Sequence, residues 1–197
     1  MKTKQKILAT ATDLFLEKGV DRVGVREIAT KAGVNLSLMN YYFQSKENLF
    51  DTIFEMLVKE KALKTREILE TDAPLEQKIK DYTFAYIDLI IERPILVSFV
   101  LSVIHRNPEK VKTMGALMGL YNSEKFCAQL KAESEAGRIR PVDPEQLFIS
   151  LISLILFPLA IKDLIMDKNS FNTKEYVKFI NDRKAHVSTL INSFLKL

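Results

Sequence analysis

Apolar residues recur every three or four positions along most of the chain, which is the spacing of helices with one buried face. In the first third, this pattern predicts helices over residues 2–18, 25–32, 36–43 and about 46–69. Gly19 and Gly33 end the first two of these helices, as glycine often does, and Ser45 is expected to cap the fourth. No stretch of any length alternates apolar and polar residues as a strand does, so the sequence predicts an all-α fold.

Proline interrupts the pattern in the remaining two thirds of the chain. Here the spacing predicts helices over residues 74–92, 95–105, 108–136, 144–166 and 173–195. Pro74 opens the first of them, and Asp143 and Thr173 are expected to cap the last two. Pro158 lies inside the helix over 144–166 and is expected to kink it.

Composition limits the class of protein. The chain has 197 residues, 47% of them hydrophobic, enough for one large domain or for a small domain joined to a larger one. Its most apolar run, residues 147–161, is shorter than the roughly 20 residues that span a bilayer, so we expect a buried helix and no membrane partner. The N-terminus lacks the apolar core of a signal peptide, which predicts a cytoplasmic location. The lone cysteine, Cys127, excludes an intramolecular disulfide and a cysteine-based zinc site.

The positive charge is concentrated near the N-terminus. The net charge is +4, and residues 1–50 carry eight bases against five acids, whereas the other 147 residues carry 21 bases and 20 acids. A basic surplus in a quarter of the chain indicates a polyanionic partner for that part, although a surplus of this size is also common on solvated surfaces.

The helices predicted at 25–32 and 36–43 have the spacing of a helix-turn-helix. Ala29 is small enough for a close helix crossing, and Gly33 tolerates the positive φ of a tight turn. Ile28, Val34 and Met39 supply the apolar interface. An ordinary helical hairpin can also contain an alanine and a glycine, but the charge surplus and the shortness of the second helix favour DNA binding.

The outward face of that short helix suits the floor of a major groove. Met39, Tyr42 and Phe43 are expected to turn inward or to the side, which leaves exposed Leu36, Ser37, Asn40, Tyr41 and Gln44. An amide can bond an adenine edge, a serine hydroxyl can bond either kind of base, and a leucine can contact a thymine methyl.

At this point the chain resembles the TetR-type transcriptional regulators. The resemblance rests on residues 1–50, which contain the family's pattern as Ile28-Ala29, Ala32-Gly33-Val34, Tyr42-Phe43, Ser45-Lys46-Glu47 and Leu49. It implies a three-helix DNA-binding domain over residues 1–48 and a larger helical domain for ligand binding and dimerisation over residues 49–197. Gly24, Leu36 and Asn40 depart from residues frequent in the family, which implies a different operator and, at Gly24, a lost phosphate hydrogen bond.

The resemblance also implies roles for single residues. Lys46 and Tyr42 resemble phosphate contacts, and Ser37, Asn40 and Tyr41 resemble groove-facing residues. Together with Leu36 and Arg26, these residues form the expected set of DNA contacts.

A single short recognition helix buries too little surface for tight specific binding, so we expect a homodimer that reads two half-sites of double-stranded DNA. The last two predicted helices are expected to form the interface, as the family's four-helix bundle implies. The candidates for burial there are Phe148, Leu151, Ile155, Leu159, Phe179, Val187, Leu190, Ile191 and Phe194.

The resemblance further implies an effector pocket among the helices between residues 74 and 166. The candidate walls are Phe84, Ile87, Phe99, Val103, Met114, Met118, Tyr121 and Phe157, although such stripes also occur in any helical core. They contain no carboxylate or histidine pair, so we expect no metal and an apolar or aromatic small-molecule effector.

The function predicted from the sequence is therefore a ligand-responsive DNA-binding repressor. No Gly-rich phosphate loop, metal-ligand cluster or nucleophile–base spacing is found, so we assign no catalytic residue, cofactor or enzyme activity. The alternatives are a transcriptional activator, a DNA-binding protein without an effector, and a helical protein–protein adaptor.

Overall fold

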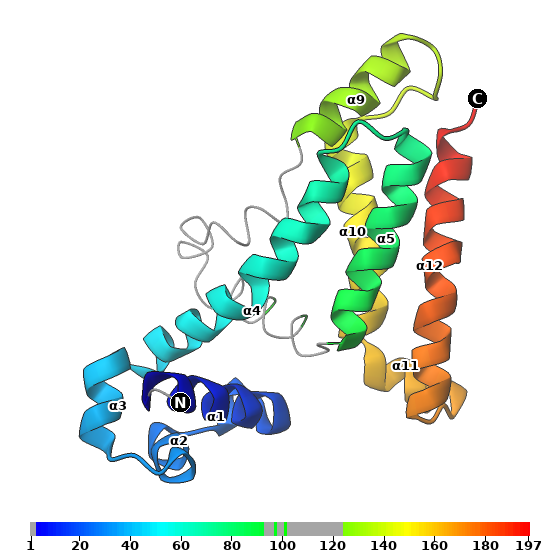
Figure 1. Ribbon diagram of the computed structural model, residues 1–197. Coiled ribbons are helices and arrows are strands. Elements are labelled where there is room, and N and C mark those ends of the chain that lie inside the picture. Colours follow the sequence, from blue (N-terminus) through cyan, green and yellow to red (C-terminus); the bar gives the residue numbers. More distant parts are fainter. Residues whose placement is uncertain (1–2, 93–96, 98–100, 102–123) are drawn as a thin grey trace. The chain divides into compact units, whose positions relative to one another are not determined.

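The computed structural model describes residues 3–92, 97, 101 and 124–197, and every regular element within these residues is helical (Figure 1). The all-α prediction is confirmed. The chain forms two compact units, Met1–Glu60 and Lys61–Leu197, which divide inside one long helix. The functional boundary expected between residues 48 and 49 stays a prediction.

The first unit contains three short α-helices, one 3-10 turn and the start of the long helix. These are α1 (Thr3–Lys18), η1 (Val20–Arg22), α2 (Val25–Ala32), α3 (Leu36–Phe43) and the first part of α4 (Lys46–Leu69). Their apolar faces meet in a core that includes Ile7, Phe15, Ile28, Met39 and Leu49, each nearly inaccessible to solvent. Burying each such side chain contributes roughly 1.5–3 kcal/mol, so the unit has a core of its own.

The second unit is built around α5 (Leu75–Glu92), α10 (Pro144–Ala160) and α12 (Thr173–Leu195). Helix α5 packs along α12, and α10 packs against both (Figure 1). Helix α9 (Glu124–Glu135) packs against α5 and α10, where the rings of Tyr82, Phe126 and Phe148 meet at centroid distances of 6.2 Å. The helix expected over 95–105 and most of that over 108–136 lie outside the described residues.

The prediction of a single helix over 144–166 is wrong. Helix α10 ends at Ala160, and after Ile161 the shorter α11 (Lys162–Asn169) continues at an angle of 63° to it. The bend follows Pro158 by three residues instead of falling at it. Among the described residues no single helix is long and apolar enough to cross a membrane, although α10 and α11 together pass that test of length and composition.

Two side chains of α12 bind the carbonyl oxygens around this break. Pro158 has no N–H to donate to the carbonyl of Leu154, and the guanidinium of Arg183 donates to that oxygen instead at 2.7 Å. The Pro158 carbonyl accepts from the hydroxyl of Tyr176 at 3.1 Å. Buried carbonyls need partners, so α12 makes the bend compatible with a packed interior.

Helix α12 spans the residues expected, but its cap is not the expected one. Its cap is Asn172, whose side chain accepts from the backbone N–H of Glu175, while the Glu175 carboxylate accepts from the N–H of Asn172. Thr173, the expected cap, is the first helical residue. This reciprocal pair satisfies two N–H groups that a helix start leaves without partners.

The bond between Arg183 and Leu154 can be tested by a double-mutant cycle. Pro158→Ala restores an N–H that can bond to the Leu154 carbonyl, so Arg183→Met should cost about 1 kcal/mol less in that background than in the parent chain. The measurement is the free energy of unfolding in urea of the four full-length proteins. Additive effects of the two substitutions would show that the Arg183 bond does not replace the missing helical one.

Candidate DNA-binding site

The turn between α2 and α3 has the geometry expected from the sequence. Gly33 closes α2 with φ 62° and ψ 39°, a left-handed conformation that glycine adopts without strain. The N–H of Val34 returns to the carbonyl of Ala29 at 3.0 Å. Ile28, Ala29 and Met39 are all buried in the core of this unit, as the predicted interface between the two helices requires.

Local hydrogen bonds define both ends of α3. Asn35 caps it by accepting from the N–H of Leu38 at 2.8 Å. Gln44 ends it with φ 60°, which is uncommon for a residue other than glycine. Ser45 then caps α4, as expected, by accepting from the N–H of Asn48 at 3.1 Å. The recognition helix is thus limited to eight residues on both sides.

One face of α3 is anchored and the other is free. Met39 and Phe43 are buried in the first unit, and Leu36 packs partly against its core. Ser37 and Asn40 are exposed, and Tyr41 is 80% exposed, so these three side chains share the accessible side. A short helix with a free polar face can enter a major groove without unpacking the domain.

Tyr42 lies at the edge between these two faces. Its side chain is 36% exposed and its ring packs edge-on against Tyr41 at a centroid distance of 5.2 Å and tilted against Phe43 at 6.3 Å. The ring therefore packs against its neighbours while part of the residue stays accessible to solvent. This placement agrees with the expected double role, in which Tyr42 packs the helix and contacts a phosphate.

The paired cations of this unit lie on α1 and α2. The ammonium of Lys18 binds Glu27 at 2.6 Å, and that of Lys31 lies 3.5 Å from Glu17. The hydrogen bond from Lys18 lowers the pKa of the Glu27 carboxyl, with a smaller contribution from the backbone N–H of Gly24. Gly24 is the cap residue of α2 and has no side chain that could form a hydrogen bond there, and the loss of a phosphate hydrogen bond at this position stays a prediction.

The remaining cations are available to a polyanion. Lys4, Lys6, Arg22, Arg26 and Lys46 form no ion pair with any residue that the structure describes in this unit. Of these, Arg26 and Lys46 belong to the expected set of DNA contacts. Contacts to DNA phosphates require ammonium or guanidinium groups that are not already paired with a carboxylate.

Lys4 and Lys6 are candidates that the sequence reasoning missed. The ammonium of Lys4 lies over the Phe43 ring, 5.8 Å from its centroid, at the end of α3. The ammonium of Lys6 lies at the turn before α3, 3.4 Å from where a side chain at Gly33 would begin. Local sequence does not reveal this placement, because Lys4 and Lys6 reach the two ends of α3 only through the packing of α1 against that part of the fold.

Comparisons with known proteins agree with this geometry. The family model for bacterial regulatory proteins of the TetR family matches residues 7–53. The uncharacterised regulator YhgD of Bacillus subtilis is 29% identical over 161 residues, 76% of this chain and 82% of its own. The probable regulator YttP of the same organism is 45% identical over 49 residues, 25% of this chain and 24% of its own.

The crystal structure of FadR from Bacillus subtilis in complex with stearoyl-CoA has the same fold. It matches with a TM-score of 0.70 at 18% identity and covers 97% of this chain and 98% of its own. Residues 7–53 therefore match the DNA-binding domain of the TetR family, and the helix-turn-helix described above lies within them. Over most of its length the chain is similar to a bacterial transcriptional regulator of the helix-turn-helix type.

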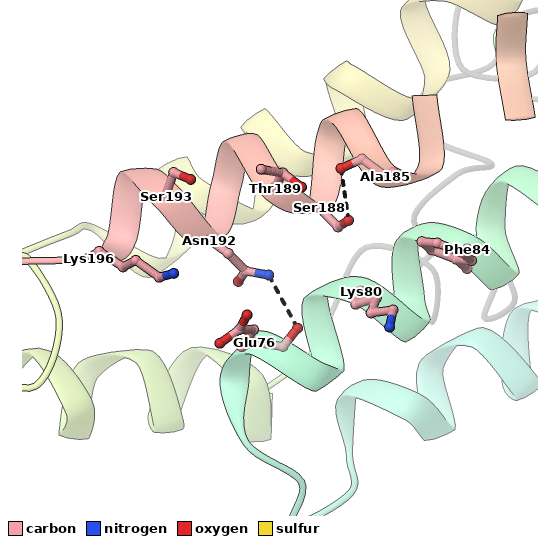
Figure 2. Close-up of a pocket in the computed structure, with 9 residues that line it drawn as sticks. All are labelled: Glu76, Lys80, Phe84, Ala185, Ser188, Thr189, Asn192, Ser193 and Lys196. Carbon is pink, nitrogen blue, oxygen red and sulfur yellow. Dashed lines mark hydrogen bonds between the residues drawn. The ribbon is translucent and has the colours of Figure 1, made fainter. Parts of the chain in front are cut away.

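Of the side chains expected to line the effector pocket, three lie among the described residues. Ile87 is buried in α5, while Phe157 on α10 is 63% exposed. Phe84 lies in an open groove of about 280 Å³ between α5 and α12, with Lys80 and Lys184 at 6.0 and 5.8 Å from its ring (Figure 2). The other five candidates lie outside the described residues: Phe99, Val103, Met114, Met118 and Tyr121.

The expected dimer residues fall into two groups. Five are buried within the second unit and belong to its core: Phe148, Leu151, Ile155, Val187 and Ile191. Leu159 and Phe179 are half-buried, and Leu190 and Phe194 are 46% and 50% exposed. Of these nine residues, only the last four retain surface that a second protomer can cover. They remain the candidates for the dimer interface.

The two missed lysines can be tested through salt dependence. Lys4→Gln and Lys6→Gln should each reduce the slope of log K against log salt by about 0.9 for a duplex of random sequence, because each removes one phosphate contact. Binding is measured by fluorescence anisotropy of the full-length protein at several salt concentrations. Lys31→Gln is the control, since that lysine is paired with Glu17. If Lys4→Gln and Lys6→Gln had the same slope as the parent chain and the Lys31→Gln control, Lys4 and Lys6 would not contact phosphates.

Proposed function

We propose that this protein is a TetR-family repressor that binds a palindromic operator as a homodimer and is released by a small apolar or aromatic effector. The observation that carries the proposal is the exposed polar face of α3, with unpaired lysines at its two ends. A surface of this kind can combine base contacts that specify sequence with phosphate contacts that position the helix.

Each side chain of the site has a role in this proposal. Asn40 donates to and accepts from an adenine edge, Ser37 bonds a neighbouring base, and Leu36 contacts a thymine methyl. Tyr41 lies against the groove wall, and Tyr42 contacts a phosphate. Arg26 and Lys46 bind phosphates, as do Lys4 and Lys6.

Dimerisation gives the regulator its two half-sites. Leu190 and Phe194 lie one helical turn apart on α12 and are about half exposed, while Phe157 on α10 is also exposed. Apolar side chains at this spacing form a stripe that a second copy can cover by the same stripe, as twofold symmetry requires. Two recognition helices then read sites separated by about one turn of DNA or a multiple.

Release by an effector requires two states of the dimer. The effector binds better to the form whose recognition helices do not fit the operator, and a shift from nearly full to nearly empty occupancy takes about 5.5 kcal/mol of differential binding. Helix α4 runs from Lys46 to Leu69 and belongs to both units, so it is the covalent path for the change. FadR of Bacillus subtilis, which has the same fold, binds stearoyl-CoA, a molecule with a long apolar chain.

The first test is selection of genomic DNA fragments by the purified protein, followed by binding assays with two variants. Asn40→Ala should change the preferred sequence, whereas Lys46→Ala should weaken binding to all sequences by about the same factor. A palindromic selected site supports the dimeric regulator. Selection of no preferred sequence, with binding insensitive to salt, would favour the protein–protein adaptor instead.

The proposed interface predicts a change in oligomeric state. The double substitution Leu190→Glu, Phe194→Glu should weaken the dimer by at least about tenfold, because it places charges in the centre of an apolar contact. Analytical ultracentrifugation measures this dissociation constant. Thr189→Glu is the control, since it adds a charge to the same helix on the side of the groove against α5 (Figure 2). An unchanged dimer in the double variant would place the interface elsewhere.

A further inference from the structure

A second cavity lies where α10 breaks. It has a volume of about 210 Å³ and lies between the C-terminal end of α5, the break, and the first turn of α12. Its aliphatic walls are Ile90 and Ile91 of α5, Leu159 of α10 and Val177 of α12. None of its lining residues is among those expected to line the effector pocket, so this cavity is a separate feature.

One wall of the cavity is the ring of Tyr176. Its hydroxyl donates to the Pro158 carbonyl at 3.1 Å, which fixes the ring at the break. Burial, and to a smaller extent the nearby Asp163, raises the pKa of Tyr176 to about 12. The phenol is therefore neutral at physiological pH and presents an uncharged aromatic face.

Besides Tyr176, two of the described lining residues carry polar side-chain groups. The half-buried ammonium of Lys162, at the start of α11, lies 5.6 Å from the centre of the Tyr176 ring. It forms no ion pair with the residues that the structure describes in this unit, the adjacent Asp163 included. The exposed hydroxyl of Thr173 also lines the cavity. A single positive charge thus faces a wall that is otherwise apolar.

We propose that this cavity binds a small amphipathic carboxylate. The carboxylate accepts hydrogen bonds from Lys162 and Thr173, and its apolar body lies against the four aliphatic side chains and the Tyr176 ring. An inorganic anion would leave the aliphatic wall unused, and a neutral apolar molecule would desolvate the ammonium without a partner.

The size of the cavity limits the ligand further. Ligand pockets commonly have volumes of about 300–1,000 Å³, and this one is smaller. A six-carbon acid or a monocyclic aromatic acid is of suitable size, whereas a long acyl chain or a polycyclic ring system is not. The carboxylate distinguishes this ligand from the small apolar or aromatic effector of the proposed function.

The test uses hexanoate and the neutral 1-hexanol as probes of the full-length protein, with ligand-observed NMR as the readout. Lys162→Met keeps the aliphatic stem of the side chain and removes its charge. Lys168→Met, an exposed lysine on the same helix that lines neither described cavity, is the matched control. Val177→Phe fills the cavity, and thermal melting followed by circular dichroism verifies that each variant is folded.

We expect hexanoate to bind the parent chain at least tenfold more tightly than 1-hexanol. Lys162→Met should remove this preference, Lys168→Met should keep it, and Val177→Phe should abolish binding of both probes. Equal affinities of acid and alcohol for the parent chain, or an unchanged preference in Lys162→Met, would overturn the proposal. The assay contains no DNA, so its outcome is independent of the proposed repressor function.

Discussion

The DNA-binding unit depends on the packing of one face of a two-turn helix. A helix as short as α3 has little stability in water, because the cost of nucleation is recovered over too few hydrogen bonds. Met39 and Phe43 anchor it to a core supplied by α1, α2 and α4, and Asn35 satisfies one of its free N–H groups. The anchors lie on one side, so Ser37 and Asn40 are not needed for folding and are free for DNA.

The same division is found among the charges. Two cations on the surface of this unit, Lys18 and Lys31, already have carboxylate partners on neighbouring helices. Lys4, Lys6 and Lys46 have no carboxylate partner among the described residues, so their charges are not neutralised by an ion pair there. At least two of the basic side chains of this segment, Lys4 and Lys6, therefore lie at the ends of α3, where a polyanion could contact them.

The short-range features were predictable, and the long-range ones were not. Gly33, Asn35 and Ser45 act through hydrogen bonds within a few residues, so the helix boundaries from α1 to α5 could be predicted closely. The break at Ile161 depends on two residues of another helix, and periodicity carries no information about them. Likewise, an apolar stripe on α10 or α12 does not reveal whether a residue such as Leu151 faces its own core or a partner. Lys4 and Lys6 reach α3 only through the three-dimensional crossing of α1.

The bend between α10 and α11 also constrains the order of folding. Its carbonyl groups are satisfied by side chains 18 and 29 residues farther along the chain, so a hydrogen-bonded bend cannot form from local contacts alone. Closing loops of that length costs conformational entropy before the contacts stabilise the structure. The two side-chain hydrogen bonds of the bend can form only once α12 has docked. Docking of α12 therefore stabilises the path of the chain from α10 into α11.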